Sequence, residues 1–129
     1  MKKKLDKIAL KNKLSPISFE VTQNSATEAP FSGKYNNLKE NGSYLCVCCE
    51  EKLFSSSNKY NSGSGWPSFT KTINDNNIKL IEDNSFGMKR IEVKCRECDA
   101  HLGHVFDDGP EPENKRYCIN SVSLKFRKK

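Results

Sequence analysis

The chain has few apolar residues and no long hydrophobic run. Hydrophobic residues make up 35% of its 129 residues and charged residues 29%, which is a low apolar fraction for a globular domain. No run approaches the roughly 18 apolar residues of a transmembrane helix, which argues against a membrane protein. The start of the chain also lacks the apolar stretch and small-residue cleavage site of a secretory signal. These absences predict a cytoplasmic protein, in which cysteines stay reduced and serve metals or catalysis.

Excess positive charge is missing from the body of the chain, although the net charge is +6. Six lysines and one aspartate give residues 1–13 a charge of +5, and three lysines and one arginine give residues 125–129 a charge of +4. The remaining residues therefore carry −3. A nucleic-acid binder would carry its charge on a folded face. We therefore expect no nucleic-acid partner, and solvated basic tails at 1–14 and 127–129 around a single domain at 15–126.

Long amphipathic helices are also missing after residue 25, and the only repeat is a duplicated Cys-x-x-Cys. A helix is predicted to begin at Ser15-Pro16, where serine is a good N-cap and proline suits the first helical position, and to end near Gln23. Alternating apolar and polar residues between turn signals predict strands at 80–82, 88–94, 101–106 and roughly 116–126. The pattern favours a mostly antiparallel β domain.

Two Cys-x-x-Cys pairs, Cys46 with Cys49 and Cys95 with Cys98, predict a zinc site. Two residues between ligands let a tight turn aim both thiolates at one ion, and two such turns complete a tetrahedral shell. Because all four ligands come from the protein, the site would be structural rather than catalytic. The alternative is buried free thiols or two disulfides. Cys48 is left over and is interpreted as a strand residue without a role.

The remaining cysteine, Cys118, lies in the segment Arg-Tyr-Cys-Ile-Asn. On a strand, Arg116, Cys118 and Asn120 would share one face, because side chains alternate. A nearby positive charge lowers the pKa of a thiol and favours the nucleophilic thiolate. The alternative is that Cys118 is a small core residue of the strand.

Histidine and tryptophan are scarce, and their positions are informative. The only two histidines, His101 and His104, could face one site from a strand that bends at Gly103. Histidine exchanges protons near neutral pH, although structural or metal-binding roles are alternatives. The only tryptophan, Trp66, lies in a glycine- and proline-rich loop. It is either a platform for a small apolar group or a core residue.

Together these segments resemble the methionine-R-sulfoxide reductase family (MsrB). Five segments match the family in order and spacing, and they span nearly everything from residue 15 to residue 126: 30–33, 44–54, 62–69, 95–110 and 116–126. The resemblance implies two antiparallel β-sheets with short N-terminal helices, and a zinc ion far from the active site. It also implies a thiol-dependent enzyme that repairs oxidised methionine through a cysteine sulfenic acid.

The resemblance assigns a role to each candidate residue. Cys118 would attack the sulfoxide sulfur, and Trp66 would receive the ε-methyl group of the substrate. Three residues would position the sulfoxide oxygen and a proton-carrying water: His101, His104 and Asn120. Arg116 would help to hold the thiolate, and Asp108 would belong to the residues around the site that support it. The substrate would be methionine sulfoxide, free or within proteins, and the enzyme is expected to be a monomer.

Ser64 departs from the family pattern. Many members have a resolving cysteine two residues before the tryptophan of the Gly-Trp-Pro-Ser-Phe loop, and serine cannot form that disulfide with Cys118. We therefore expect thioredoxin or a small thiol to reduce the sulfenic acid directly, rather than Cys48 to resolve it. Two other classes explain less of the sequence. A zinc-ribbon module for nucleic acid leaves the histidines and Trp66 unused, and a thioredoxin-like protein needs alternating helices and strands.

Overall fold

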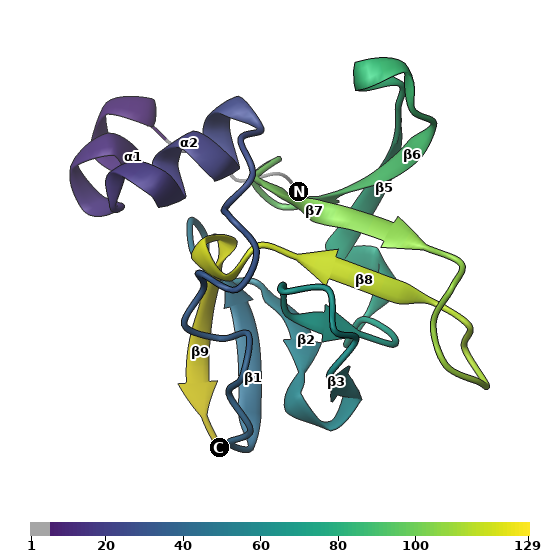
Figure 1. Ribbon diagram of the computed structural model, residues 1–129. Helices are drawn as coiled ribbons and strands as arrows, with labels where there is room; N and C mark the ends of the chain where they lie inside the picture. The colour runs from purple at the N-terminus through teal and green to yellow at the C-terminus, as the bar shows by residue number, and fades with distance from the viewer. Residues whose placement is uncertain (1–5) are drawn as a thin grey trace.

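The computed structural model describes residues 6–129, which begin with two short helices (Figure 1). They are α1 (Lys7–Lys13) and α2 (Pro16–Asn24). The Ser15 hydroxyl accepts a hydrogen bond from the backbone N–H of Ser18, and proline occupies the first helical position. Both features favour a helix start. The helix predicted to begin at Ser15 and to end near residue 23 is confirmed.

The basic ends of the chain are more ordered than predicted. A solvated tail is wrong for residues 6–14, because the Asp6 carboxylate caps α1 and both Leu10 and Leu14 are buried. Leu10 lies within α1 and Leu14 is the residue that caps its C-terminal end, and the burial of both side chains stabilises the helix despite its lysines. Residues 1–5 of that tail lie outside the described residues. At the other end, Arg127 and Lys128 belong to a strand, so a tail is wrong there as well.

Two antiparallel sheets form the body of the molecule, as the family resemblance implied (Figure 1). The smaller sheet has the order β2-β1-β9 and the larger the order β3-β4-β8-β7-β6-β5. The strands are β1 (Gly42–Cys46), β2 (Lys52–Ser55), β3 (Lys59–Tyr60), β4 (Ser68–Phe69), β5 (Ile78–Asp83), β6 (Arg90–Cys95), β7 (His101–Phe106), β8 (Arg116–Ile119) and β9 (Leu124–Lys128). Short 3₁₀ turns are η1 (Ser56–Asn58), η2 (Asp75–Asn77), η3 (Ser85–Gly87) and η4 (Ser121–Ser123). The strands predicted at 80–82, 88–94 and 101–106 are confirmed.

The single strand predicted over 116–126 is wrong. Strand β8 ends at Ile119, turn η4 follows, and β9 then pairs with β1 in the other sheet. Asn120 marks the break, since its backbone N–H donates to the carbonyl of Leu102 and its own carbonyl accepts from Ser123 N–H. Alternation along the segment therefore stops near Asn120, and the residues beyond it do not extend the face that carries Cys118.

An aromatic core joins the two sheets. The rings of Phe54 and Phe69 stack with centroids 4.4 Å apart, and Tyr44 meets Phe69 edge-on at 5.2 Å. Phe69 also lies opposite Tyr117 in the register of β4 and β8. Because strand side chains alternate, this packing leaves Cys118 on the opposite face of the large sheet. Within residues 6–129, no helix has the length and apolar character needed to span a membrane.

Candidate active site and metal centre

Cys118 lies in the middle of the large sheet, between two polar side chains. In the register of β8 it is opposite His104 of β7 and Ser68 of β4. Residues directly opposite each other in antiparallel strands share a face and lie within contact distance. The half-buried thiol therefore has an imidazole on one side and a hydroxyl on the other.

A cavity of about 300 Å³ opens over this thiol. Its lining brings Cys118 together with four of the side chains that the sequence singled out for the site. It also includes residues that the sequence did not reveal. The lining consists of Thr27, Ser64, Trp66, Arg90, Gly103, His104, Phe106, Arg116, Cys118 and Asn120. The two remaining predicted site residues, His101 and Asp108, lie outside the lining.

The electrostatics of Cys118 differ from the prediction. Burial raises the pKa of the thiol, and the Arg116 charge together with a hydrogen bond from Ser64 partly offsets that rise. We had expected the cation to decide the direction of the shift. Burial in low dielectric disfavours the thiolate more strongly than the neighbouring cation favours it.

Arg116 is held rigidly beside the cavity. Its Nε and Nη2 donate to the two carboxylate oxygens of Asp108 at 2.9 and 3.1 Å. Its guanidinium also lies over the Phe106 ring, 4.4 Å from the centroid. Arg116 is thus fixed by a bidentate ion pair and an aromatic contact, which is the geometry that arginine favours. Asp108 acts through this pair and does not itself reach the cavity.

The two histidines lie on one face of β7 because the strand contains an irregularity. Residues three apart on a regular strand would point to opposite faces. The register with β6 shifts by one residue between Val93 and Lys94, which leaves Leu102 as the extra residue on β7. This bulge brings the rings of His101 and His104 to 5.6 Å, nearly perpendicular to each other. The bend that the sequence placed at Gly103 therefore lies one residue earlier.

Each histidine is held by its own carboxylate. His104 Nε2 lies 2.8 Å from Asp83 Oδ2, and His101 Nδ1 lies 2.7 Å from Glu92 Oε2. The hydrogen bond from His104 holds the pKa of Asp83 well below its usual range. Burial lowers the pKa of His101, although Glu92 opposes that shift. His104 faces the cavity, whereas His101 is buried beside it.

Trp66 and Asn120 are both bound to one residue that the sequence did not single out. Trp66 is half-buried and lines the cavity, so it is not a core residue. Its indole Nε1 donates to the carbonyl of Glu28 at 3.1 Å. The Asn120 Oδ1 accepts from the backbone N–H of Glu28 at 3.0 Å, and its Nδ2 donates to the carbonyl of Leu102. No spacing rule connects Glu28 to these positions, because its contacts bridge about 40 and 90 residues of chain.

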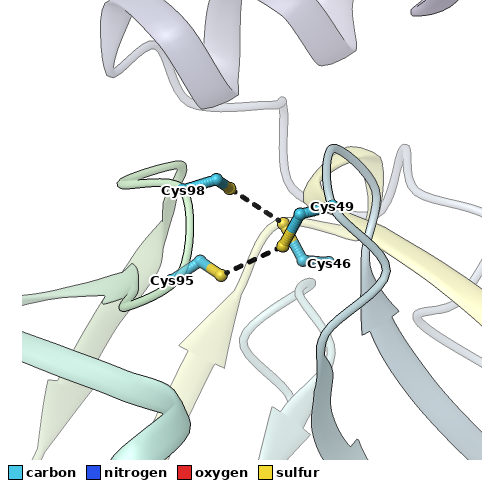
Figure 2. A group of neighbouring side chains, drawn as sticks. All are labelled: Cys46, Cys49, Cys95 and Cys98. Atoms are coloured by element: carbon cyan, nitrogen blue, oxygen red, sulfur yellow. Dashed lines mark hydrogen bonds between the residues drawn. The ribbon is translucent and has the colours of Figure 1, made fainter. Parts of the chain in front are cut away.

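Four cysteines form a second site, where the two sheets approach each other (Figure 2). The sulfurs of Cys46, Cys49, Cys95 and Cys98 all lie within 4.8 Å of one another. Cys46 faces Cys98 and Cys49 faces Cys95, each pair with its sulfurs 3.6 Å apart (Figure 2). Thiolates around tetrahedral zinc, with Zn–S bonds of about 2.3 Å, would be about 3.8 Å apart. The donor set and its dimensions therefore fit a metal ion such as zinc.

The two cysteine turns repeat the same backbone geometry. Cys46 and Cys95 each end a strand, and each carbonyl accepts an N–H four residues later at 2.8 Å. The donors, Glu50 and Asp99, have left-handed φ angles of 66° and 64°. Cys48 lies within the first turn and outside the sulfur cluster, so its interpretation as a strand residue is wrong.

Comparison with known proteins identifies the family. The model of the SelR domain matches residues 14–128. The chain belongs to the SelR domain family. It is 60% identical to a protein of Pseudomonas fluorescens over 111 residues, which cover 86% of this chain and 85% of that protein. It is 51% identical to a protein of Thioalkalivibrio sulfidiphilus over 119 residues, which cover 92% of this chain and 87% of that protein. It is 53% identical to a protein of Escherichia coli over 117 residues, which cover 91% of this chain and 85% of that protein.

All three relatives carry the name peptide methionine sulfoxide reductase MsrB. The resemblance that the sequence motifs indicated is therefore confirmed. The SelR match extends over both cysteine turns and over Cys118, so the metal cluster and the thiol cavity belong to the same domain.

Proposed function

We propose that this SelR domain protein reduces the R epimer of methionine sulfoxide to methionine. The observation that carries the proposal is the Cys118 thiol, which lies opposite His104 on one sheet face beneath a cavity of about 300 Å³. A nucleophile with an acid beside it is what the reaction requires, because sulfoxide oxygen leaves only when it is protonated. The names of the three relatives support the same chemistry.

In the reaction, Cys118 attacks the sulfur of the substrate and the S–O bond breaks. The oxygen, with a proton, ends on Cys118 as a sulfenic acid, and methionine leaves. Arg116 and the Ser64 hydroxyl stabilise the attacking thiolate against the cost of burial. His104 holds the proton that the sulfoxide oxygen takes, and Asp83 fixes the orientation of its ring.

The cavity walls account for the choice of substrate. Trp66 offers an aromatic face to the ε-methyl group, while Asn120 lies on the side that receives the sulfoxide oxygen. His101, behind His104, keeps that ring in place. With methyl group and oxygen fixed on different sides of Cys118, only one epimer presents its sulfur to the thiol.

An external thiol restores the enzyme. Two thiols convert the sulfenic acid to the free Cys118 thiol, with formation of one disulfide and one water. Among residues 6–129, Cys118 is the only cysteine that lines the cavity, and Ser64 stands at the position where many family members have a resolving cysteine. Cys48 is buried in the turn of the metal cluster. Thioredoxin or a small thiol is therefore the reductant. We further propose that the enzyme acts as a monomer and in the cytoplasm.

The four-cysteine cluster holds one structural Zn²⁺. All four donors come from the protein, which leaves no open position for a substrate. None of the four cysteines belongs to the cavity lining among the described residues. When bound, the metal ties the end of β1 to the β6–β7 turn.

An epimer-resolved assay with a dithiol reductant tests the proposal. We expect turnover of methionine-R-sulfoxide at least about 100-fold above that of the S epimer, because a fixed methyl wall and oxygen site discriminate geometrically. Cys118→Ser should abolish turnover while secondary structure and zinc content stay unchanged. After one turnover without reductant, mass analysis should find one added oxygen on Cys118. Equal turnover of both epimers would refute the stereochemical proposal, and a Cys48–Cys118 disulfide would refute direct reduction.

A further inference from the structure

Glu28 is a buried carboxyl group in a segment without helix or strand. Its exposed fraction is 3%, and it lies between α2 and the first strand, where the chain passes the cavity. Burying a carboxyl group costs free energy unless its oxygens find partners. The contacts of Glu28 therefore show what its burial stabilises.

The hydrogen bonds of Glu28 reach two distant parts of the chain. Its carbonyl accepts from Trp66 Nε1 at 3.1 Å, and its N–H donates to Asn120 Oδ1 at 3.0 Å. Its carboxylate Oε1 accepts from the backbone N–H of Val122, also at 3.0 Å. The side chain thus fixes the backbone of Glu28 to turn η4, and that backbone binds two side chains of the cavity. The preceding residue, Thr27, lines the cavity as well.

The surroundings of the carboxyl group exclude water. A Cβ atom added to Gly33 would lie 2.5 Å from Glu28 Oε2 and 2.1 Å from Ser121 Oγ, so only glycine allows the loop to close over them. Glu28 Oε2 and Ser121 Oγ are both buried away from solvent, side by side beneath Gly33. Burial raises the pKa of Glu28, and hydrogen bonds from the N–H groups of Val122 and Ser121 and from the Ser121 hydroxyl partly oppose that rise. A carboxyl group enclosed in this way is an anchor and not a solvated surface charge.

We infer that Glu28 is the positioning residue of this site, which fixes Trp66 and Asn120 relative to each other across the cavity. The inference deepens the proposed function and rests on it, because Trp66 is the methyl wall and Asn120 lies on the oxygen side. Their separation determines how the sulfoxide is seated above Cys118. Loss of the Glu28 anchor frees both walls, and at the thiol it removes only a small charge effect that raises the pKa of Cys118.

Two substitutions at Glu28 separate its shape from its charge. Glu28→Gln keeps an acceptor for Val122 N–H and adds an N–H donor for Ser121 Oγ, so it should retain activity within about twofold of the wild type. Glu28→Ala removes the anchor, and we expect kcat/KM for the R epimer to fall about 10- to 100-fold. The matched control is Glu20→Ala, an exposed glutamate of α2 bonded to Asn24, which should behave as the wild type.

Two readouts distinguish positioning from general stability. Trp66 is the only tryptophan of the chain, so its fluorescence reports directly on the indole held by Glu28. Glu28→Ala should shift the emission to the red and increase quenching by acrylamide, while Glu28→Gln and Glu20→Ala should not. With rates normalised to titrated Cys118 thiol, Glu28→Ala should also raise KM and lower the preference for the R epimer. Partial unfolding alone would lower apparent kcat and leave KM unchanged.

A second route covers the case in which Glu28→Ala does not fold. Gly33→Ala retains Glu28 but displaces its carboxyl group, so the same fluorescence and KM changes are expected. Wild-type fluorescence and KM in both Glu28→Ala and Gly33→Ala would overturn the inference, as would an equal effect of Glu20→Ala. Failure of the proposed function looks different. In that case the wild type would reduce neither epimer, while the change in Trp66 fluorescence would still appear.

Discussion

Cys118 and Arg116 illustrate how burial competes with charge at a single residue. The cation lowers the pKa of the thiol, yet the net shift is upward because the thiol is enclosed. Residue types in the sequence indicated which groups meet at the site. They did not indicate the depth of the cavity, and depth decides the direction of the shift. Thiol reactivity here depends on a cation that only partly offsets desolvation.

Arg116→Met should make Cys118 less reactive. Removal of the cation raises the pKa of Cys118 further, so the thiolate forms at higher pH. Alkylation of Cys118 and sulfoxide reduction should both slow about tenfold at pH 7, and the acidic limb of the pH–rate profile should shift to higher pH. Lys115→Met is the control, because Lys115 pairs with Asp107 at the surface. A pH–rate profile that coincides with that of the wild type would contradict the role of Arg116.

The acidic partners of the site illustrate what single residues in the sequence could not reveal. Asp83, Glu92 and Glu28 are three of sixteen acidic residues, and nothing in their local sequence separates them from the rest. Each meets its partner through strand pairing or through a loop that crosses the sheet. By contrast, Trp66 and the two histidines stood out because their types are rare in the chain, and Cys118 stood out because it is the one cysteine outside the two cysteine turns.

At the scale of elements, strand β7 supplies the geometry of the site. The bulge at Leu102 turns both histidines to one face, and the next residue, Gly103, allows β8 to approach. A Cβ atom at Gly103 would lie 2.0 Å from the carbonyl oxygen of Cys118. The sequence predicted the strand with its correct ends but not the bulge, since a one-residue shift depends on the pairing with β6.

This close approach predicts the effect of Gly103→Ala. Strand β8 would have to move, so we expect about 1–3 kcal/mol lower stability and a loss of activity of about 100-fold. The control is Gly87→Ala at the hairpin turn, where φ is +68° and space is open. Left-handed strain there costs about 1–2 kcal/mol, with activity retained. Denaturant unfolding together with the sulfoxide assay would separate the two variants, and full activity of Gly103→Ala would contradict the argument.

At the scale of the whole molecule, the sequence predicted the fold class, the cysteine cluster and five of the ten residues that line the cavity. The Cys-x-x-Cys pairs could be recognised because a tight turn is a local structure, and the chain contains two copies of it. The break at Asn120 could not be recognised. The alternating pattern of residues is the same whether a strand continues in one sheet or the chain crosses to another sheet. The crossing depends on the contacts of Asn120 with Leu102 and Glu28.

The cysteine cluster also determines how the whole molecule holds together. It joins the end of β1, in the small sheet, to the turn between β6 and β7 in the large one. In a chain with only 35% hydrophobic residues, a metal ion bound by this cluster would contribute directly to folding. Without the ion, four cysteines would lie close together with no bond between the two sheets.

Chelation and ligand substitution should therefore destabilise the protein as a whole. We expect about one zinc per chain, and a decrease in Tm of at least about 10 °C when a strong chelator removes it. Cys98→Ser should reproduce both the metal loss and the lower Tm. Cys48→Ser should keep its zinc, because Cys48 lies outside the sulfur cluster although it shares the turn. Elemental analysis and thermal unfolding measure both quantities. Unchanged Tm after complete chelation, or metal loss from Cys48→Ser equal to that from Cys98→Ser, would show that the cluster does not hold the two sheets together in this way.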